Sequence, residues 1–254
     1  MSDRSITRVR HEARQRLLDV VGVRRVNPHL IRITLGGEQL AGFTSLGFDD
    51  HVKVFVPSEG EVSEAGAPKP AMRDYTPHDF DPKSLTLQID FALHDAGPVT
   101  GWALRAREGD KLLIGGPRSS FVVGMGFDWH LMVGDDTALP AIRRRLAELP
   151  EGSRAVVFVE LHGPEDEEPF ESRADVEAYW LYRNHAGRGE TCSLVNAVSK
   201  ARLPEGAYYA WIACESSDAK FIRAGLLTHG AAPSAFKASG YWRRGSVATH
   251  DVHE

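Results

Sequence analysis

Hydrophobic and polar residues alternate along the first half of the chain. Residues 29–35 (HLIRITL) carry an aliphatic side chain at every second position, and residues 51–57 (HVKVFVP) and 84–94 (SLTLQIDFALH) repeat this pattern. Stretches rich in Gly, Pro and Asp separate these runs. A period of two indicates half-buried strands, and several short strands with such breaks predict an antiparallel β-barrel or sandwich.

The second half of the chain has a different pattern, which begins after a glycine-rich joint. Nearly continuous apolar runs, such as residues 129–134 (WHLMVG) and 154–161 (RAVVFVEL), alternate with helical stretches such as 135–149 (DDTALPAIRRRLAEL). This alternation is typical of a parallel sheet covered on both faces. The sequence therefore predicts a β + α/β protein, with an antiparallel β-barrel domain over residues 1–124 and a small doubly wound parallel α/β domain over 125–254.

The composition is that of a globular protein, with 254 residues of which 42% are hydrophobic and 26% charged. The 30 Lys and Arg residues against 35 Asp and Glu residues give a net charge of −5, which argues against nucleic-acid binding. No apolar run approaches the ~20 residues that span a bilayer, and the polar N-terminus lacks the apolar region of a secretion signal. We therefore expect a soluble, cytoplasmic monomer without a membrane span.

The chain has two cysteines, Cys192 and Cys214. An ordinary iron–sulfur cluster needs four thiolates, and a structural zinc site needs several Cys or His residues at short spacing. The sequence therefore predicts two thiols in the core and no bound metal. Any redox chemistry must come from an organic cofactor.

A candidate flavin contact lies between two predicted strands, in residues 72–77 (MRDYTP). The Arg73 guanidinium can bind a phosphate through two hydrogen bonds, the Tyr75 ring can pack against an isoalloxazine, and Thr76 can reach the polar edge of that ring. This motif alone is too short to exclude a surface turn with a solvated arginine.

A second candidate contact follows the strand that carries Asp90 and His94. Residues 95–103 (DAGPVTGWA) resemble a helix start, with Pro98 in the first turn and Thr100 as a possible cap. The free N–H groups of a helix start can bind a pyrophosphate. A plain capped helix is the alternative.

The third motif, residues 132–142 (MVGDDTALPAI), reads as a strand, a tight turn and a helix start. It lies where the first turn of a nucleotide-binding α/β domain belongs, and ligands of such sheets bind at the carboxyl ends of the strands. It lacks the G-x-G-x-x-G fingerprint, so on its own it supports dinucleotide binding only weakly.

In this order, the three motifs resemble the siderophore-interacting proteins, which are FAD-dependent NAD(P)H ferric-siderophore reductases of the ferredoxin-reductase-like superfamily. The resemblance covers nearly the whole chain, and it includes residues 26–32 (VNPHLIR), 51–54 (HVKV), 116–119 (GPRS) and 240–245 (GYWRRG). It implies that the barrel binds FAD and that the α/β domain binds NADH or NADPH.

The resemblance also implies which residues form the sites. Those that it places on FAD are Arg73, Tyr75, Thr76, Asp90, His94, Gly97, Val99 and Thr100. Those that it places on the nicotinamide nucleotide are Gly134, Asp135, Thr137, Ala138 and Glu215, while Trp242 lies on a C-terminal strand that returns to the flavin. Because a ferric siderophore is often anionic and the chain is negative overall, we expect a local basic patch to bind it, with Lys53, Arg118 and Arg243 as candidates.

The implied chemistry is hydride transfer from the nicotinamide to the flavin, followed by single-electron transfer to Fe(III) held by the siderophore. Siderophore oxygens hold Fe(II) much more weakly, so reduction releases the iron without a general base or a catalytic triad. Two alternatives stay open: a general flavin reductase with another electron acceptor, and a non-catalytic ferric-siderophore carrier.

Three positions depart from the family pattern. His78 stands where an arginine is usual after Y-T-P, Asp136 stands in place of a glutamate, and Cys214 stands in place of a glycine. Cys214 would either affect access of the hydride donor or simply fill space at a strand end. The acidic run of residues 162–168 (HGPEDEE) favours NADH over NADPH, although Arg173 or Arg183 could still bind a 2′-phosphate.

Overall fold

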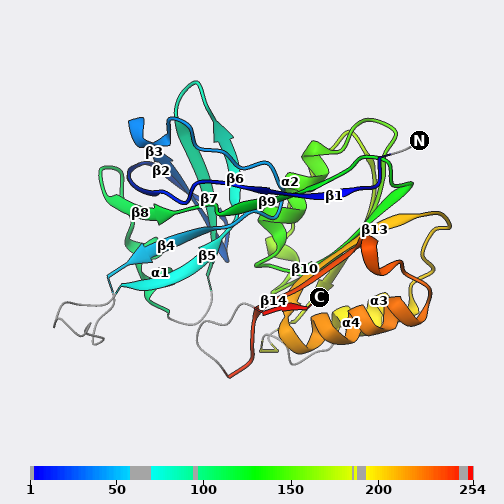
Figure 1. The fold of residues 1–254 in the computed structure, drawn as a ribbon. Coiled ribbons are helices and arrows are strands. Elements are labelled where there is room, and N and C mark those ends of the chain that lie inside the picture. The colour runs from blue at the N-terminus through cyan, green and yellow to red at the C-terminus, as the bar shows by residue number, and fades with distance from the viewer. Residues whose placement is uncertain are drawn as a thin grey trace. The chain divides into compact units, whose positions relative to one another are not determined.

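A computed structural model describes residues 3–57, 70–93, 97–184, 186–187, 193–245 and 251–253 (Figure 1). The chain divides into two compact units, one formed by Thr7–Val122 and the other by Met1–Ile6 with Val123–Glu254. Each unit has its own sheet and its own hydrophobic core. Among the described residues, no helix combines the length and the apolar character that crossing a membrane requires.

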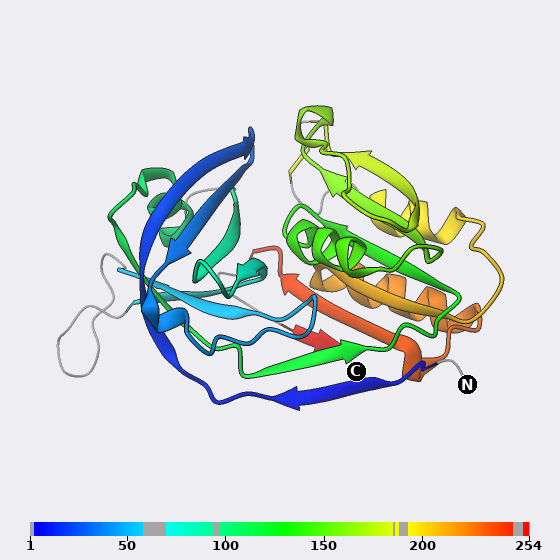
Figure 2. The same cartoon turned by 90° about the horizontal axis from the view of Figure 1, so that it is seen from above.

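The first unit is built on a seven-stranded antiparallel sheet with the order β5-β4-β8-β2-β3-β7-β6. Figure 2 shows the long hairpin of β2 and β3 in blue. The strands are β2 (Gln15–Asn27), β3 (Leu30–Gly36), β4 (Val52–Val56), β5 (Ala71–Tyr75), β6 (Pro77–Asp81), β7 (Thr86–Ala92) and β8 (Lys111–Gly115). The helix α1 (Pro98–Arg105) and the short turn Glu38–Leu40 complete this unit, and β1 (Ile6–Arg10) pairs with β9 (Ser119–Val123).

Alternation in the sequence correctly predicts three strands of this unit, β3, β4 and β7. In β4, Val52, Val54 and Val56 are buried, whereas Lys53 and Phe55 are half-buried on the opposite face. The apolar faces of β2, β3, β4, β7 and β8 meet in one core. This arrangement leaves the polar face of β4 free to carry a binding site.

The second unit contains a six-stranded sheet with the order β12-β11-β10-β13-β14-β15, in which only the β15 pairing is antiparallel. Helices α3 and α4 lie on one side of the sheet and α2 on the other (Figure 2). The strands are β10 (Trp129–Asp135), β11 (Arg154–Leu161), β12 (Asp175–Tyr182), β13 (Tyr208–Glu215), β14 (Phe236–Trp242) and β15 (Asp251–His253). The helices are α2 (Leu139–Glu148), α3 (Ser193–Lys200) and α4 (Ser216–Thr228), with short turns at Pro164–Asp166 and Pro233–Ala235.

This order confirms the predicted doubly wound parallel sheet. The chain runs from β10 outward to β12, and it then returns to the other side of β10 to form β13. The order of the strands therefore reverses between β10 and β13, and ligands bind at the carboxyl ends of the strands at such a switch point. Residues 3–6 join this unit as well, since Arg4 pairs with Asp128 at 3.0 Å.

A buried histidine in this unit makes its stability sensitive to acid. His130 is 2% exposed, and among the described residues its Nδ1 has no hydrogen-bond partner. Burial, and then the nearby Arg145 guanidinium, lower the pKa of His130 from 6.5 to about 3. Below pH 6.5 the unfolded chain binds a proton that the folded chain does not, so stability falls as the pH drops from 6.5 toward 3.

We expect the free energy of unfolding to fall by on the order of 2 kcal/mol between about pH 6.5 and about pH 4.5 through this residue alone. Urea unfolding at both pH values measures this loss of stability. His130→Gln should not show it, because a glutamine does not titrate. His229→Gln, at an exposed position of the same unit, is the matched control. An equal loss of stability in the wild type and in His130→Gln would show that His130 is not responsible.

Candidate functional site

The predicted flavin contacts of the barrel unit gather at the end of β5. The Tyr75 ring packs on Phe91 with ring centroids 4.5 Å apart, and Phe91 in turn packs on Trp102 at 5.9 Å. Burial raises the pKa of the Tyr75 phenol, which therefore stays neutral. Thr76 is buried, whereas Arg73 is half-buried and donates through Nη1 to the Met72 carbonyl at 2.7 Å.

The second predicted contact is the start of α1. Gly97 is the N-cap residue, with Pro98 in the first turn, and no side chain caps the helix. The prediction that Thr100 caps α1 was wrong, because Thr100 lies inside the helix and is buried together with Val99. Among the described residues, a Cβ on Gly97 would meet nothing within 4 Å. His94 lies outside the described residues.

Asp90 is engaged in an ion pair that sequence analysis missed. Arg32 of β3 donates to both carboxylate oxygens of Asp90 on β7, at 2.6 and 2.8 Å, and the Asp90 side chain is fully buried. The two residues are direct partners across the strands, a register that periodicity alone does not reveal. That Asp90 contacts the flavin stays a prediction. If it does, Arg32 would hold the Asp90 carboxylate in place.

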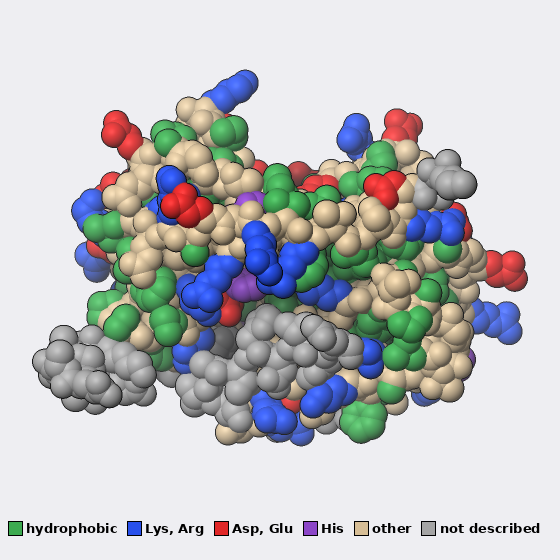
Figure 3. All heavy atoms as spheres, viewed as in Figure 1, with side chains coloured by type: hydrophobic (Ala, Val, Ile, Leu, Met, Phe, Trp, Pro, Cys, Tyr) green, Lys and Arg blue, Asp and Glu red, His purple; other side chains and the backbone are tan. Residues whose placement is uncertain are grey.

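A basic cavity of about 230 Å³ opens beside β4. It brings together Lys53 and Arg118, two of the three residues predicted to bind substrate, and adds Arg14 and His51. Phe55 and Gly116 line its apolar part. Lys53 also pairs at 3.0 Å with Asp74 of the neighbouring β5. On the face drawn in Figure 3, Lys and Arg side chains gather around a histidine.

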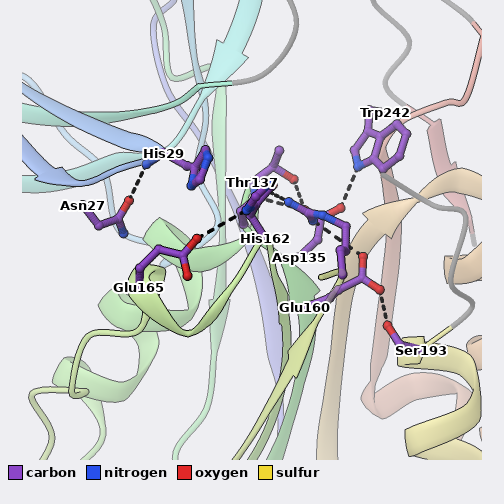
Figure 4. Close-up of polar contacts among 11 residues, drawn as sticks. Asn27, His29, Asp135, Thr137, Glu160, His162, Glu165, Ser193 and Trp242 are labelled. Atoms are coloured by element: carbon purple, nitrogen blue, oxygen red, sulfur yellow. Dashed lines mark hydrogen bonds and ion pairs between the residues drawn. The ribbon is translucent and has the colours of Figure 1, made fainter. Parts of the chain in front are cut away.

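In the α/β unit, hydrogen bonds to the Asp135 carboxylate hold the first turn after β10 in place. The Asp135 carboxylate accepts hydrogen bonds from the Thr137 N–H at 2.9 Å and from the Thr137 hydroxyl. Its other oxygen accepts from the Trp242 indole N–H at 2.6 Å (Figure 4). A Cβ on Gly134 would overlap Ala138 and lie 2.9 Å from the Ala213 carbonyl oxygen, so only glycine fits there.

Glu215 caps the start of α4, one strand away from this turn. Its carboxylate accepts hydrogen bonds from the backbone N–H groups of Ser217 at 2.5 Å, Asp218 at 3.2 Å and Arg244 at 3.2 Å. Burial alone would raise the pKa of Glu215, but these N–H donors, of which Arg244 contributes most, lower it. The six predicted nucleotide and C-terminal residues Gly134, Asp135, Thr137, Ala138, Glu215 and Trp242 thus frame the switch point of one sheet.

Cys214 packs into the core of the same unit. Its side chain is 1% exposed, and burial, followed by nearby carboxylates of which Asp135 is the first, raises the pKa of its thiol. Of the two predicted roles, the structure therefore favours filling space at the strand end. Cys192 lies outside the described residues.

Arg183, named above as a possible contact of a 2′-phosphate, and Glu160, which sequence analysis did not assign, also lie at this edge of the sheet. Arg183 is buried and pairs with Asp136 at 2.7 Å and with Glu160 at 3.6 Å. Ser193 donates a hydrogen bond to Glu160, and His162 faces Glu165 at 3.5 Å (Figure 4). Because Arg183 already has two carboxylate partners, it is poorly suited to a 2′-phosphate. Arg243 is exposed after β14.

Comparison with known proteins assigns both units. The model of the siderophore-interacting FAD-binding domain matches residues 19–121, and that of the siderophore-interacting protein matches residues 127–245. The chain is 36% identical to the NADPH-dependent ferric-chelate reductase of Escherichia coli (strain K12), over 92% of this chain and 95% of the relative. This chain belongs to the siderophore-interacting protein family.

A further relative and two solved structures are also similar to this chain. The chain is 32% identical to ferric vibriobactin reductase ViuB of Vibrio cholerae, over 91% of this chain and 90% of the relative. A siderophore utilization protein from T. fusca superposes with a TM-score of 0.88 at 35% identity, covering 96% of this chain and 98% of the other. A ferredoxin reductase of carbazole 1,9a-dioxygenase, at 17% identity and a TM-score of 0.64, shares the fold.

The residues of the barrel unit fit the FAD that this family binds. The start of α1 has no side-chain cap, so its N–H groups suit a pyrophosphate. The Arg73 guanidinium can add a charged contact to a phosphate, and the neutral, ring-packed Tyr75 offers an aromatic surface. In this family member, these three features are the ones that would hold the cofactor.

Proposed function

We propose that this protein is an FAD-dependent NAD(P)H:ferric-siderophore oxidoreductase, which reduces Fe(III) in a siderophore and thereby releases iron as Fe(II). The observation that carries the proposal is the cavity beside β4, where Arg14, Lys53 and Arg118 gather in the same unit as Arg73 and Tyr75. The names of the relatives from Escherichia coli and Vibrio cholerae point to the same activity.

The basic cavity performs the recognition step. Arg14, Lys53 and Arg118 attract an anionic ferric complex, and the ring of Phe55 offers an apolar surface to the aromatic or aliphatic parts of a chelator. The Asp74 carboxylate holds the Lys53 ammonium in place across the two strands. Arg243, an exposed arginine of the α/β unit, stays a separate candidate contact for the anionic complex.

The chemistry that FAD supplies when bound is the conversion of a two-electron hydride donor into single-electron steps to Fe(III). One NAD(P)H thus reduces two Fe(III) ions to Fe(II) and releases one proton. The chain itself binds and orients the reactants, with Gly134, Asp135 and Thr137 at the switch point as the proposed nucleotide contacts. No side chain needs to act as a general base.

The proposed electron donor is NADH or NADPH. The protein is proposed to act as a monomer in the cytoplasm, where both nucleotides are present in their reduced form. Steady-state kcat/KM with each nucleotide compares the two donors. Light scattering on the purified protein measures its mass in solution. Fractionation of cells tests the location.

Turnover of the FAD-loaded protein with NADH or NADPH and a ferric siderophore tests the proposed reaction, with Fe(II) trapped by a chromophoric chelator. We expect Fe(II) to form well above the rate with free FAD. No gain over free FAD would remove the siderophore assignment, and fast transfer to a quinone in its place would indicate a general flavin reductase. A protein that binds the ferric complex but consumes no NAD(P)H would be a carrier.

Lys53→Ala is expected to raise the KM for an anionic ferric siderophore about tenfold while kcat changes little, because the lost charge attracts the substrate without taking part in electron transfer. Lys111→Ala is the matched control, since Lys111 also pairs with an aspartate, Asp19, elsewhere in the unit. An equal KM in Lys53→Ala and the wild type would place the substrate outside this cavity.

A further inference from the structure

A fully buried serine joins three chain segments next to the basic cavity. The Ser120 hydroxyl lies 2.5 Å from the Asp50 carboxylate and 2.6 Å from the His11 Nε2 atom. It also accepts a hydrogen bond from the Leu46 N–H at 3.1 Å. Ser120 is 0% exposed and Asp50 is 2% exposed, so water does not replace these contacts.

The direction of these hydrogen bonds follows from the number of protons available. A carboxylate only accepts, so the single hydroxyl proton of Ser120 points to Asp50. The lone pairs of the hydroxyl then accept from Leu46 and from His11, which requires a proton on the His11 Nε2 atom. Asp50 collects two further donors, the Ser45 hydroxyl at 2.9 Å and the Gly47 N–H at 3.2 Å.

The three joined segments carry basic residues that line the cavity. Each residue of the chain of hydrogen bonds lies within three positions of a lining residue of the cavity. The three pairs are His11 and Arg14, Asp50 and His51, and Ser120 and Arg118. Backbone hydrogen bonds continue the connection, from the His11 N–H to the Arg118 carbonyl at 2.9 Å and from the Gly116 N–H to the Arg14 carbonyl at 3.0 Å.

The loop that carries Asp50 also lies tightly against the strand that carries Ser120. A Cβ on Gly47 would lie 2.7 Å from the Phe121 carbonyl oxygen, so this approach requires glycine. A buried, charge-assisted chain of hydrogen bonds fixes the backbone that carries Arg14 and Arg118.

We propose that the His11–Ser120–Asp50 hydrogen-bond chain is a positioning device for the substrate cavity, with His11 and Ser120 as positioning residues that hold Arg14, His51 and Arg118 in binding geometry. The inference rests on the proposed function, because it takes this cavity as the subsite for the ferric siderophore. It assigns these residues no contact with substrate or cofactor.

The test uses the FAD-loaded holoenzyme and three variants: His11→Leu, which removes the donor, His11→Gln, which restores one, and Ser120→Ala. The probe is the anionic ferric complex of 2,3-dihydroxybenzoate, with binding measured by equilibrium dialysis on the oxidised protein. We expect the dissociation constant to rise about tenfold in His11→Leu and to return close to the wild-type value in His11→Gln. The KM should follow the dissociation constant, while kcat stays within about twofold.

Hydrogen exchange provides a second measurement that does not depend on the iron complex. We expect faster amide exchange in residues 13–15, 51–53 and 115–118 of His11→Leu and Ser120→Ala, with no change in His11→Gln. Ser84→Ala is the matched control, because the Ser84 hydroxyl also donates to an aspartate, Asp81, in a turn of the same unit.

The outcomes separate the inference from the proposed function. Unchanged binding and unchanged exchange in His11→Leu would overturn the positioning role. A loss of binding accompanied by an equal loss of kcat, not rescued by His11→Gln, would also overturn it, because this would mean general damage. If the wild type fails to bind the complex but exchange rises in the three segments, the positioning role stands and the siderophore assignment falls.

Discussion

Arg73→Ala is expected to yield a protein that has lost most of its FAD. The side chain lies in β5, two residues before the ring-packed Tyr75, and the proposed contact joins a guanidinium to a phosphate. Loss of such a charged, two-bond contact costs about 3 kcal/mol, which weakens FAD binding about 100-fold. The ratio of flavin to protein absorbance, followed by titration with FAD, measures the effect.

Arg107→Ala is the control for this prediction, because Arg107 is an exposed arginine of the same unit, in the turn before β8. It should bind FAD like the wild type. Full flavin occupancy in Arg73→Ala would mean that the cofactor lies elsewhere in the barrel unit. An intermediate affinity in Arg73→Lys would support the charged contact, since lysine keeps the charge but not the two-bond geometry.

Gly134→Ala is expected to slow reduction by NAD(P)H at least about tenfold while FAD stays bound, since even a small displacement of a binding turn disrupts the geometry of transfer. The added methyl group would overlap Ala138 and approach the Ala213 carbonyl oxygen at 2.9 Å, so the turn after β10 must move. Overpacking of this kind lowers the free energy of unfolding by about 1–3 kcal/mol.

Anaerobic mixing with NADH or NADPH, monitored by flavin absorbance, measures the rate, and dithionite confirms that the flavin can still be reduced. Gly225→Ala is the matched control in the same unit, because among the described residues a Cβ on Gly225 would meet no atom outside its own helix backbone within 4 Å, and α4 gains helix propensity. A normal rate of reduction in Gly134→Ala would show that the nucleotide does not bind at the switch point between β10 and β13.

The sequence determines the strands and the sheet types of this fold more clearly than it determines the contacts of the site. Alternation correctly predicts β3, β4 and β7, because every second residue of a half-buried strand must be apolar. Apolar strands alternating with helices correctly predict the parallel sheet. The chemistry-bearing motifs were recognised from their order along the chain and from a family resemblance.

Contacts between distant segments were not predicted. The pairs Arg32–Asp90 and Lys53–Asp74 depend on the register of neighbouring strands, and a pattern of alternation does not fix that register. The ion pair between Arg183 and Asp136 joins two strand ends that only the crossover topology brings together.

The basic cavity is the clearest example of contacts between distant segments that the sequence did not predict. It takes Arg14, His51 and Arg118 from three segments that lie far apart in the sequence. Sequence analysis found Lys53 and Arg118, because both belong to motifs that resemble the family. It missed Arg14 and the His11–Ser120–Asp50 chain, which no local motif marks.

The central claim is that electrons pass from NAD(P)H through this protein to a ferric siderophore. Anaerobic stopped-flow on the FAD-loaded protein tests it most directly, by reducing the flavin with one equivalent of NADH or NADPH and then mixing it with ferric siderophores. The proposal predicts fast flavin reoxidation with two Fe(II) trapped per flavin. A flavin that is reduced by the nucleotide but is not reoxidised by any of the iron complexes would contradict it.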